Sequence, residues 1–313
     1  MHPAFSVIFF TVTSGAGFGL FTLLAILHVF GLVDMTQETI LWAGIIGIVL
    51  VAVGLMSSTF HLANPKNAWR AFFRFKTSWL SREGVFAVLF YPFALLYLLG
   101  VFLQGADING FFGAMGLIGA ALAVITIFST GMIYGCLKTI RQWNTALTPA
   151  NYIFMGLALG ALLMVSALSY QEGADVMGVT GLTVTLLAIA ALAKAVYYFW
   201  VAKVTGPTIN TATGFTRAAV RLLDTGHTAG TFLTEEFGYE PDHSVVTALK
   251  TLVFALGFGL PILLLALVLA GQAGVGIAVW ATVSAFLGII AERWLFFAEA
   301  RHVVNLYHGA QHT

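Results

Sequence analysis

The sequence predicts an all-α integral membrane protein with eight transmembrane helices. Two observations lead to this fold class. The chain has 313 residues, of which 59% are hydrophobic and only 9% are charged, and its mean hydropathy is +0.94. So few polar residues cannot cover the surface of a water-soluble globule. The apolar residues are also gathered into runs longer than the about 18 residues that indicate a membrane span.

The predicted helices follow one another along the whole chain. The first apolar run has no basic segment before it and no small-residue cleavage site after it, so we expect a retained helix and not a removed signal. We place the eight helices at about residues 4–32, 39–62, 83–104, 111–134, 149–170, 178–204, 246–271 and 274–298. Turn and helix-breaking residues separate them, among them Asn64-Pro65, Thr148-Pro149 and the glycine-containing segments 105–110, 173–178 and 271–274.

One connector, residues 205–245, is long and polar. Within it TRAAVRLLDTG (216–226) has the pattern of a short amphipathic helix, with Arg217 and Arg221 one turn apart. TFLTEEFGYEPDH (231–243) adds acidic residues, either as a contact for a partner or as a solvated loop. Because no repeat or separable soluble domain is visible, we expect one transmembrane domain over residues 1–313.

Charge sorting between the connectors predicts the orientation. The connectors after helices one, three, five and seven contain no lysine or arginine, and between them they carry Asp34, Glu38, Asp107, Glu172 and Asp175. Those after helices two and four carry the basic residues Lys66, Arg70, Arg74, Lys76, Arg82, Lys138 and Arg141. The positive-inside rule therefore predicts that both termini and the 205–245 connector are cytoplasmic. We expect a multi-pass protein of a bacterial cytoplasmic membrane, with lipid around it and no nucleic acid partner.

The sequence argues against metal centres within this chain. Its one cysteine, Cys136, excludes an internal disulfide and a cysteine-ligated zinc or iron–sulfur centre. A b-type haem needs two histidines at matching depth, but His28 lies near the outer end of the first helix and the other seven histidines are expected on or near the cytoplasmic side. We expect no haem, although a pair of His61 with a loop or C-terminal histidine stays open.

The connector FHLANPKNAWRAFFRFKTSWLSREG, residues 60–84, holds five of the fourteen basic residues. Its WRAFFRF segment places Trp69, Phe72 and Phe73 at helical spacing, with Arg70 and Arg74 on another face. One interpretation is an interfacial anchor with its rings toward lipid. The other is that the basic residues Arg70, Arg74 and Lys76 dock a partner protein.

His61 and Glu83 frame this connector at the cytoplasmic membrane boundary. A histidine and a carboxylate there suit a quinone site, because quinone reduction takes up two protons from the aqueous side. The alternative is that His61 is an ordinary hydrogen-bonded residue at a helix end.

The pattern FHLANP, then the basic aromatic stretch, then SWLSREG resembles the membrane-anchor subunit family of dimethyl sulfoxide reductase and related molybdopterin enzymes. The eight helices and the length agree with this resemblance, which spans essentially the whole chain. The opening MHPAFSVIFFTVTSGAGFGL is most similar to the branch that serves cytoplasmic sulfite-oxidising complexes.

The resemblance implies an anchor subunit without a metal centre of its own. It implies electron exchange between a four-cluster iron–sulfur subunit and the membrane quinone pool, with a molybdopterin catalytic subunit as the further partner. By position, the family's quinone-site histidine falls on His61 and its acidic partner on Glu83. The surrounding motif is matched by Asn64, Arg70, Ser81 and Arg82.

The predicted cytoplasmic connector favours sulfite oxidation, with electrons passed to quinone, over a second function. That second function is a quinol-oxidising anchor of a dimethyl sulfoxide reductase-type enzyme, whose catalytic subunits lie on the outer face. A secondary transporter is the third alternative, suggested by the ionisable residues Lys194, Glu292 and Arg293 inside predicted helices. Repeated halves with broken helices, which are frequent in transporters, are not visible in the sequence.

Lys194 and Glu292 are expected at a similar depth near the cytoplasmic end of their helices. A structural ion pair or a snorkelling lysine is the simpler interpretation, and a role in a proton path is the other. Gly15, Gly17 and Gly19 lack the strand-turn-helix context of a nucleotide loop and predict close helix packing.

Overall fold

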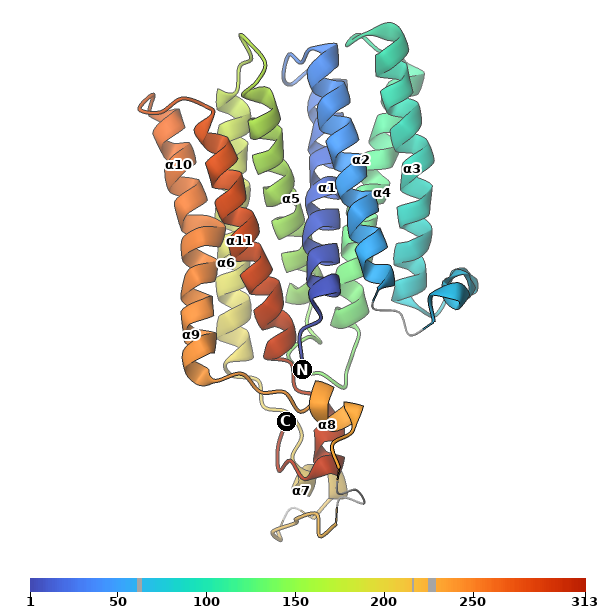
Figure 1. Ribbon diagram of the computed structural model, residues 1–313, viewed down its shortest axis with the longest axis vertical. Helices are drawn as coiled ribbons and strands as arrows, with labels where there is room; N and C mark the ends of the chain where they lie inside the picture. Colours follow the sequence, from blue (N-terminus) through green and yellow to red (C-terminus); the bar gives the residue numbers. More distant parts are fainter. Residues whose placement is uncertain (61–63, 216, 225–228) are drawn as a thin grey trace.

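The computed structural model describes residues 1–60, 64–215, 217–224 and 229–313 and shows a bundle of long helices (Figure 1). Eight helices among these residues are each long and apolar enough to cross a membrane. They are α1 (Phe5–Val29), α2 (Gln37–Thr59), α3 (Trp79–Gln104), α4 (Gly110–Gly135), α5 (Leu147–Leu168), α6 (Met177–Val201), a seventh from His243 to Leu269, and α11 (Ile277–Ala298). The eight predicted helices are confirmed, and each end lies within about four residues of its expected place.

Shorter elements lie in and between the connectors. They are the 3-10 helix η1 (Pro65–Arg74), α7 (Ile209–Thr213), α8 (Phe232–Glu236) and the 3-10 helix η3 (Val303–His308). The seventh spanning helix is built from α9 (His243–Leu252), the π-helical segment η2 (Val253–Gly259) and α10 (Leu260–Leu269). The described residues form no β-strand, only isolated bridges.

The π-helical segment has an identifiable local cause. Pro261, in the first turn of α10, has no backbone N–H to donate to the residue four positions before it. The Ser284 hydroxyl of α11 donates to the Leu256 carbonyl at 2.8 Å and satisfies one carbonyl of the widened turn. Gly288 lies so close to Gly257 that a side chain at Gly288 would overlap that backbone. This contact holds α11 against the seventh helix.

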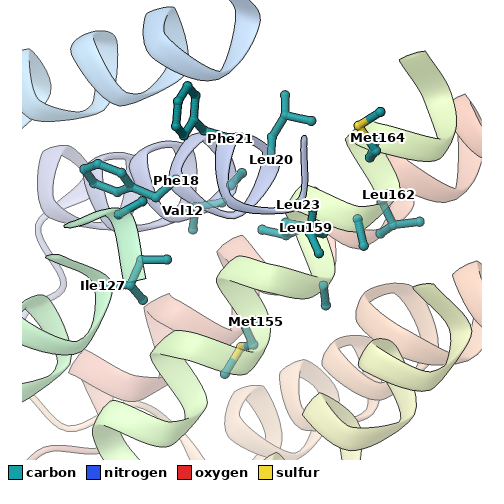
Figure 2. Close-up of a cluster of buried hydrophobic side chains, with 14 of the residues drawn as sticks. Val12, Phe18, Leu20, Phe21, Leu23, Ile127, Met155, Leu159, Leu162 and Met164 are labelled. Carbon is teal, nitrogen blue, oxygen red and sulfur yellow. The ribbon is translucent and has the colours of Figure 1, made fainter. Parts of the chain in front are cut away.

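The spanning helices form two neighbouring groups. The first group is α1–α4, and the second is α5, α6, the seventh helix and α11 (Figure 1). Most of α1 is buried, because it contacts α2 and α4 of its own group and also α5 and α11 of the second. Figure 2 shows part of this core, which includes Phe18 of α1, Ile127 of α4 and Leu159 of α5.

Glycines allow α1 to approach both α5 and α2 closely. A side chain at Gly19 of α1 would overlap the backbone at Gly156 of α5, and one at Gly160 would overlap the backbone at Gly19. Gly17 faces Gly47 of α2, where an added Cβ would lie 2.6 Å from the Gly47 carbonyl oxygen. These contacts agree with the predicted packing role of the α1 glycines.

Both chain ends lie at one end of the bundle, here called the terminal face, together with η1 and the connector between α6 and α9 (Figure 1). The basic connectors predicted to be cytoplasmic all lie at this face, and the acidic ones lie at the opposite end. The structure therefore separates charge along the bundle. Which side of the membrane the terminal face occupies stays a prediction.

The predicted amphipathic helix at 216–226 is wrong for the part that the structure describes, because residues 217–224 form turns and bends and no helix. Gly214 adopts a left-handed conformation with φ +79° and ends α7. The Asn210 side-chain amide then donates to the carbonyls of Phe215 and Ala218, which holds the chain in a tight loop. Residues 216, 225 and 226 of this prediction lie outside the described residues.

Candidate functional site

The connector between α2 and α3, together with the first residues of α3, contains most of the predicted site residues. Its central part is η1, with Trp69 and Phe73 exposed and packed edge to face at 5.7 Å. In a 3-10 helix three residues make a turn, so residues four apart are separated by about 120° around the axis. Arg70 and Arg74 therefore do not share one face, as they would in the expected α-helix. Both are exposed, as is Lys76, and none of the three forms an ion pair with a described residue.

Ser81 and Arg82, predicted beside the quinone, attach the connector to the first turns of α3. The Ser81 hydroxyl donates to the Ala71 carbonyl at 2.5 Å. The Arg82 guanidinium donates to the carbonyls of Phe75 at 3.0 Å and Lys76 at 2.8 Å, and it lies 4.2 Å from the Trp79 ring centroid. These contacts fix the path of the chain between η1 and α3, so both side chains have a positioning role here.

Glu83 lies on the second turn of α3, and its side chain is only 4% exposed. It points toward α4, where the Thr130 hydroxyl donates to Glu83 Oε1 at 2.5 Å. The same hydroxyl lies 3.0 Å from the Thr126 carbonyl oxygen. A hydroxyl has one proton, so when Thr130 donates to Thr126 the Glu83 carboxyl must be the donor to Thr130. The pair therefore accommodates the carboxyl in both protonation states.

Of the two remaining predicted residues of this site, Asn64 is among those that the structure describes. Asn64 is exposed and precedes η1, and its carbonyl accepts from the Asn67 N–H at 3.1 Å. His61 lies outside the described residues. In the structure, Ser81 and Arg82 are therefore hydrogen-bonded to the connector. The Glu83 side chain instead points into the helix bundle.

A second set of buried ionisable residues lies in the second helix group. Lys194 of α6 forms an ion pair with Oε1 of Glu292 on α11, and Arg293 Nη1 lies 3.1 Å from Glu292 Oε2. The three side chains are at most 3% exposed. The structure brings together the two residues that the sequence placed at a similar depth, and it adds Arg293 as a second cation on the same carboxylate.

Aromatic rings surround both cations of this second set. Lys194 Nζ lies 4.1 Å from the Tyr197 ring centroid and 4.5 Å from that of Tyr198. The Arg293 guanidinium carbon lies 3.7 Å from the Tyr152 ring centroid. Cation–π contacts of this kind stabilise charges that are removed from water. Sequence reasoning missed Tyr152 and Thr130, because their only signal is a hydroxyl-bearing residue within an apolar helix.

His28 is engaged at both ring nitrogens. Nε2 lies 2.7 Å from the Ala106 carbonyl oxygen, which can only accept, so Nε2 carries the proton. Nδ1 then accepts from the Tyr97 hydroxyl at 2.7 Å. This arrangement leaves neither nitrogen free for a metal. The expectation that the chain binds no haem stays a prediction.

The comparisons with known proteins cover nearly the whole chain. Residues 1–298 match the family described as DMSO reductase anchor subunit (DmsC), and these residues include all eight spanning helices. The chain is also 34% identical to a sulfite dehydrogenase subunit of Allochromatium vinosum, over 98% of this chain and 99% of that protein. Both the helical architecture and the sequence therefore agree on one assignment. The chain belongs to the DMSO reductase anchor subunit family and is a multi-pass membrane protein.

Proposed function

We propose that this chain is the membrane-anchor and quinone-reactive subunit of a molybdopterin oxidoreductase complex. It passes electrons between an iron–sulfur subunit and the quinone pool, and the electrons come from sulfite oxidation on the cytoplasmic side. The observation that carries the proposal is Glu83, a carboxyl buried in a spanning helix directly behind an exposed basic connector. Family membership and the similarity to a sulfite dehydrogenase subunit support the class of complex and the substrate.

Glu83 suits the proton chemistry of a quinone site. Reducing a quinone to a quinol takes two electrons and two protons, and in the membrane interior the protons must come from a side chain or an ordered water. Glu83 is held by the Thr130 hydroxyl and makes no ion pair with a described residue. Its carboxyl can therefore gain or lose a proton without breaking an ion pair. We assign His61 as the hydrogen-bond donor to a quinone carbonyl, with Asn64 beside it.

Arg70, Arg74 and Lys76 form the proposed docking surface for the iron–sulfur subunit, which holds four clusters in this proposal. They are exposed at the terminal face and unpaired among the described residues, so their charges remain available to carboxylates of a partner. Trp69 and Phe73 next to them suit the membrane–water boundary. The connector thus supports both interpretations, because it exposes aromatic rings that suit the lipid boundary and cations that can meet a partner.

Sidedness follows from the concentration of lysine and arginine at the terminal face. The positive-inside rule makes this face cytoplasmic in our proposal, in a bacterial cytoplasmic membrane. The molybdopterin catalytic subunit then also lies on the cytoplasmic side, bound through the iron–sulfur subunit.

The test compares two electron acceptors in the complex purified through a tag on this chain. In Glu83→Gln, the amide oxygen still accepts from Thr130, so assembly should be normal. Turnover with a short-chain quinone should fall by about 100-fold, a contribution typical of a positioned proton donor, while turnover with a soluble artificial acceptor is unchanged. His61→Ala should show the same split.

Glu38→Gln is the matched control, because Glu38 lies in the first turn of α2 at the opposite end of the bundle and should leave both activities intact. Normal quinone turnover in Glu83→Gln would place the quinone elsewhere. Loss of both activities together would show that Glu83 is a structural residue.

A further inference from the structure

Buried polar groups extend from Glu83 through the second helix group to an open cavity at the terminal face. We propose that they form a proton path, running from Lys250 and Glu299 through Tyr198, the Lys194–Glu292 pair and Tyr152 to Thr130 and Glu83. This inference rests on the proposed function, since it supplies the protons that Glu83 delivers to the quinone.

The buried charges at the centre of this path indicate a function beyond packing. Lys194, Glu292 and Arg293 are all buried in spanning helices, where removing charges from water is unfavourable. Replacing a buried ion pair by apolar side chains of similar volume is often neutral or stabilising, so packing alone does not explain three charges in this place. Intramembrane ionisable residues commonly mark ion or proton pathways.

The inner part of the path leads to Glu83 through a small cavity. Thr130, which is hydrogen-bonded to Glu83, lines it together with Thr11, Ser14 and Tyr152. Its volume of about 10 Å³ is close to what one water molecule occupies. The Tyr152 hydroxyl is buried and has no hydrogen-bond partner among the described residues. Because buried polar groups are nearly always hydrogen-bonded, we assign one water to this cavity, between Tyr152 and Thr130.

The outer part repeats this pattern at Tyr198. Its hydroxyl is also buried without a partner among the described residues. Lys194 Nζ and Lys250 Nζ lie 4.5 Å and 4.9 Å from its ring centroid, so this one ring lies beside both the central pair and the outer pair. Lys250 is half-buried, and its Nζ lies 2.6 Å from Glu299 Oε1.

Lys250 and Glu299 both line a cavity of about 390 Å³, together with Glu240, His243 and Arg301. These residues belong to the segments at the terminal face, so the outer pair contacts an open cavity that several charged residues line. The path therefore begins where water and protons are available.

Between the two hydroxyls, each group has a distinct role. Glu292 accepts a proton from the outer side and releases it toward Tyr152, and the cations Lys194 and Arg293 beside it favour the return to the carboxylate. Arg293 does not deprotonate in proteins, so it holds the Glu292 carboxylate and the Tyr152 ring in place. Each tyrosine takes a proton on its oxygen and releases its own. Two such passages supply the two protons of one quinol, whose two electrons come from the iron–sulfur partner.

Tyr152→Phe and Tyr198→Phe test the path, because each removes a hydroxyl that makes no hydrogen bond to a described residue. Folding and assembly of the complex should therefore be unchanged, as should turnover with the soluble acceptor. Turnover with a short-chain quinone should fall by about 100-fold, and its solvent deuterium isotope effect should increase. A purely structural role would not change the isotope effect.

Tyr97→Phe is the matched control. The Tyr97 hydroxyl is hydrogen-bonded to His28 in the first group, so its removal should lower thermal stability and leave quinone turnover intact. Normal quinone turnover in both path variants, with Glu83→Gln impaired, would overturn the path and leave the proposed function standing. Normal turnover in Glu83→Gln as well would overturn both. Failure of the path variants to assemble would show that the hydroxyls are structural.

Discussion

Glu83 and Glu292 are both carboxyl groups buried in spanning helices, but their surroundings differ. Glu83, in the first helix group, has the neutral Thr130 hydroxyl as its partner. Glu292, in the second group, lies between the cations Lys194 and Arg293. The first arrangement keeps the carboxyl hydrogen-bonded in both protonation states, and no ion pair is broken when the proton is gained or lost. The second fixes a carboxylate and two cations together, so structural and functional roles are combined there.

The same substitution should therefore have opposite consequences at the two positions. An amide at Glu83 keeps the hydrogen bond from Thr130, so the chemistry is lost and the fold is retained. An amide at Glu292 leaves two buried cations without a counter-charge. The largest expected effect follows from this contrast.

Glu292→Gln should destabilise the chain by about 3–5 kcal/mol, the usual effect of removing one partner of a buried ion pair. Thermal denaturation of the purified complex in detergent measures this loss. Replacing Lys194, Glu292 and Arg293 together by Met, Leu and Leu should restore most of the stability, since no buried charge then remains unpaired. A Glu292→Gln variant as stable as Glu83→Gln would contradict the contrast between the two carboxyls.

Reversing charge on the connector between α2 and α3 tests whether the iron–sulfur partner docks on the side of Glu83. Arg70→Glu combined with Arg74→Glu should release the iron–sulfur partner from membranes, because like charges facing each other at an interface cost several kcal/mol. Immunoblotting of washed membranes measures retention of the partner. Arg217→Glu with Arg221→Glu is the control on the other long connector of the same face and should retain it. Full retention in the first variant after a high-salt wash would leave the connector only its role as an interfacial anchor.

The smallest effect is a pH-dependent change in local stability at His302, which lies at the terminal face and away from both carboxyls. Partial burial lowers the pKa of His302 below its usual value, and its neutral Nδ1 accepts from the Val304 N–H at 3.0 Å at the start of η3. The neutral imidazole is favoured in the folded state, so this stability is complete above about pH 6.5 and decreases as pH falls below that value. The change should be about 1 kcal/mol or less, as for loss of a helix cap.

Limited proteolysis of the C-terminal segment at about pH 5.5 and pH 7.5 measures this change, and the fraction of imidazolium rises as the pH falls across that interval. His302→Asn keeps a capping acceptor that does not titrate, so its cleavage should not depend on pH. Equal pH dependence in both proteins would assign the effect to another group.

The sequence was sufficient for the eight helices and for the similar depth of Lys194 and Glu292, because span length and depth depend only on position along the chain. It left open whether the two residues form an ion pair. It did not reveal Thr130 beside Glu83 or Tyr152 beside Arg293. In a soluble helix the apolar face marks the buried side, but a spanning helix is apolar all round, so its rotation about its axis cannot be read from periodicity.

The sequence pattern also did not predict the backbone conformation of the connectors. The spacing of WRAFFRF favours an α-helix, in which Arg70 and Arg74 share a face, but the structure has the 3-10 form in η1. At 217–224 the pattern of arginines and leucines favoured a helix, but the Asn210 amide and Gly214 direct the chain into a loop. Local hydrogen bonds from a single side chain decided the outcome in this case.

Infrared difference spectroscopy of the purified complex, recorded as its bound quinone is reduced, tests most directly whether Glu83 exchanges protons with the quinone. The account predicts a carboxyl C=O band that changes on reduction, shifts in heavy water, and is absent in Glu83→Gln but present in the Glu38→Gln control. A band of unchanged intensity in an assembled Glu83→Gln complex would contradict the account, because the proton would then be exchanged by a different group.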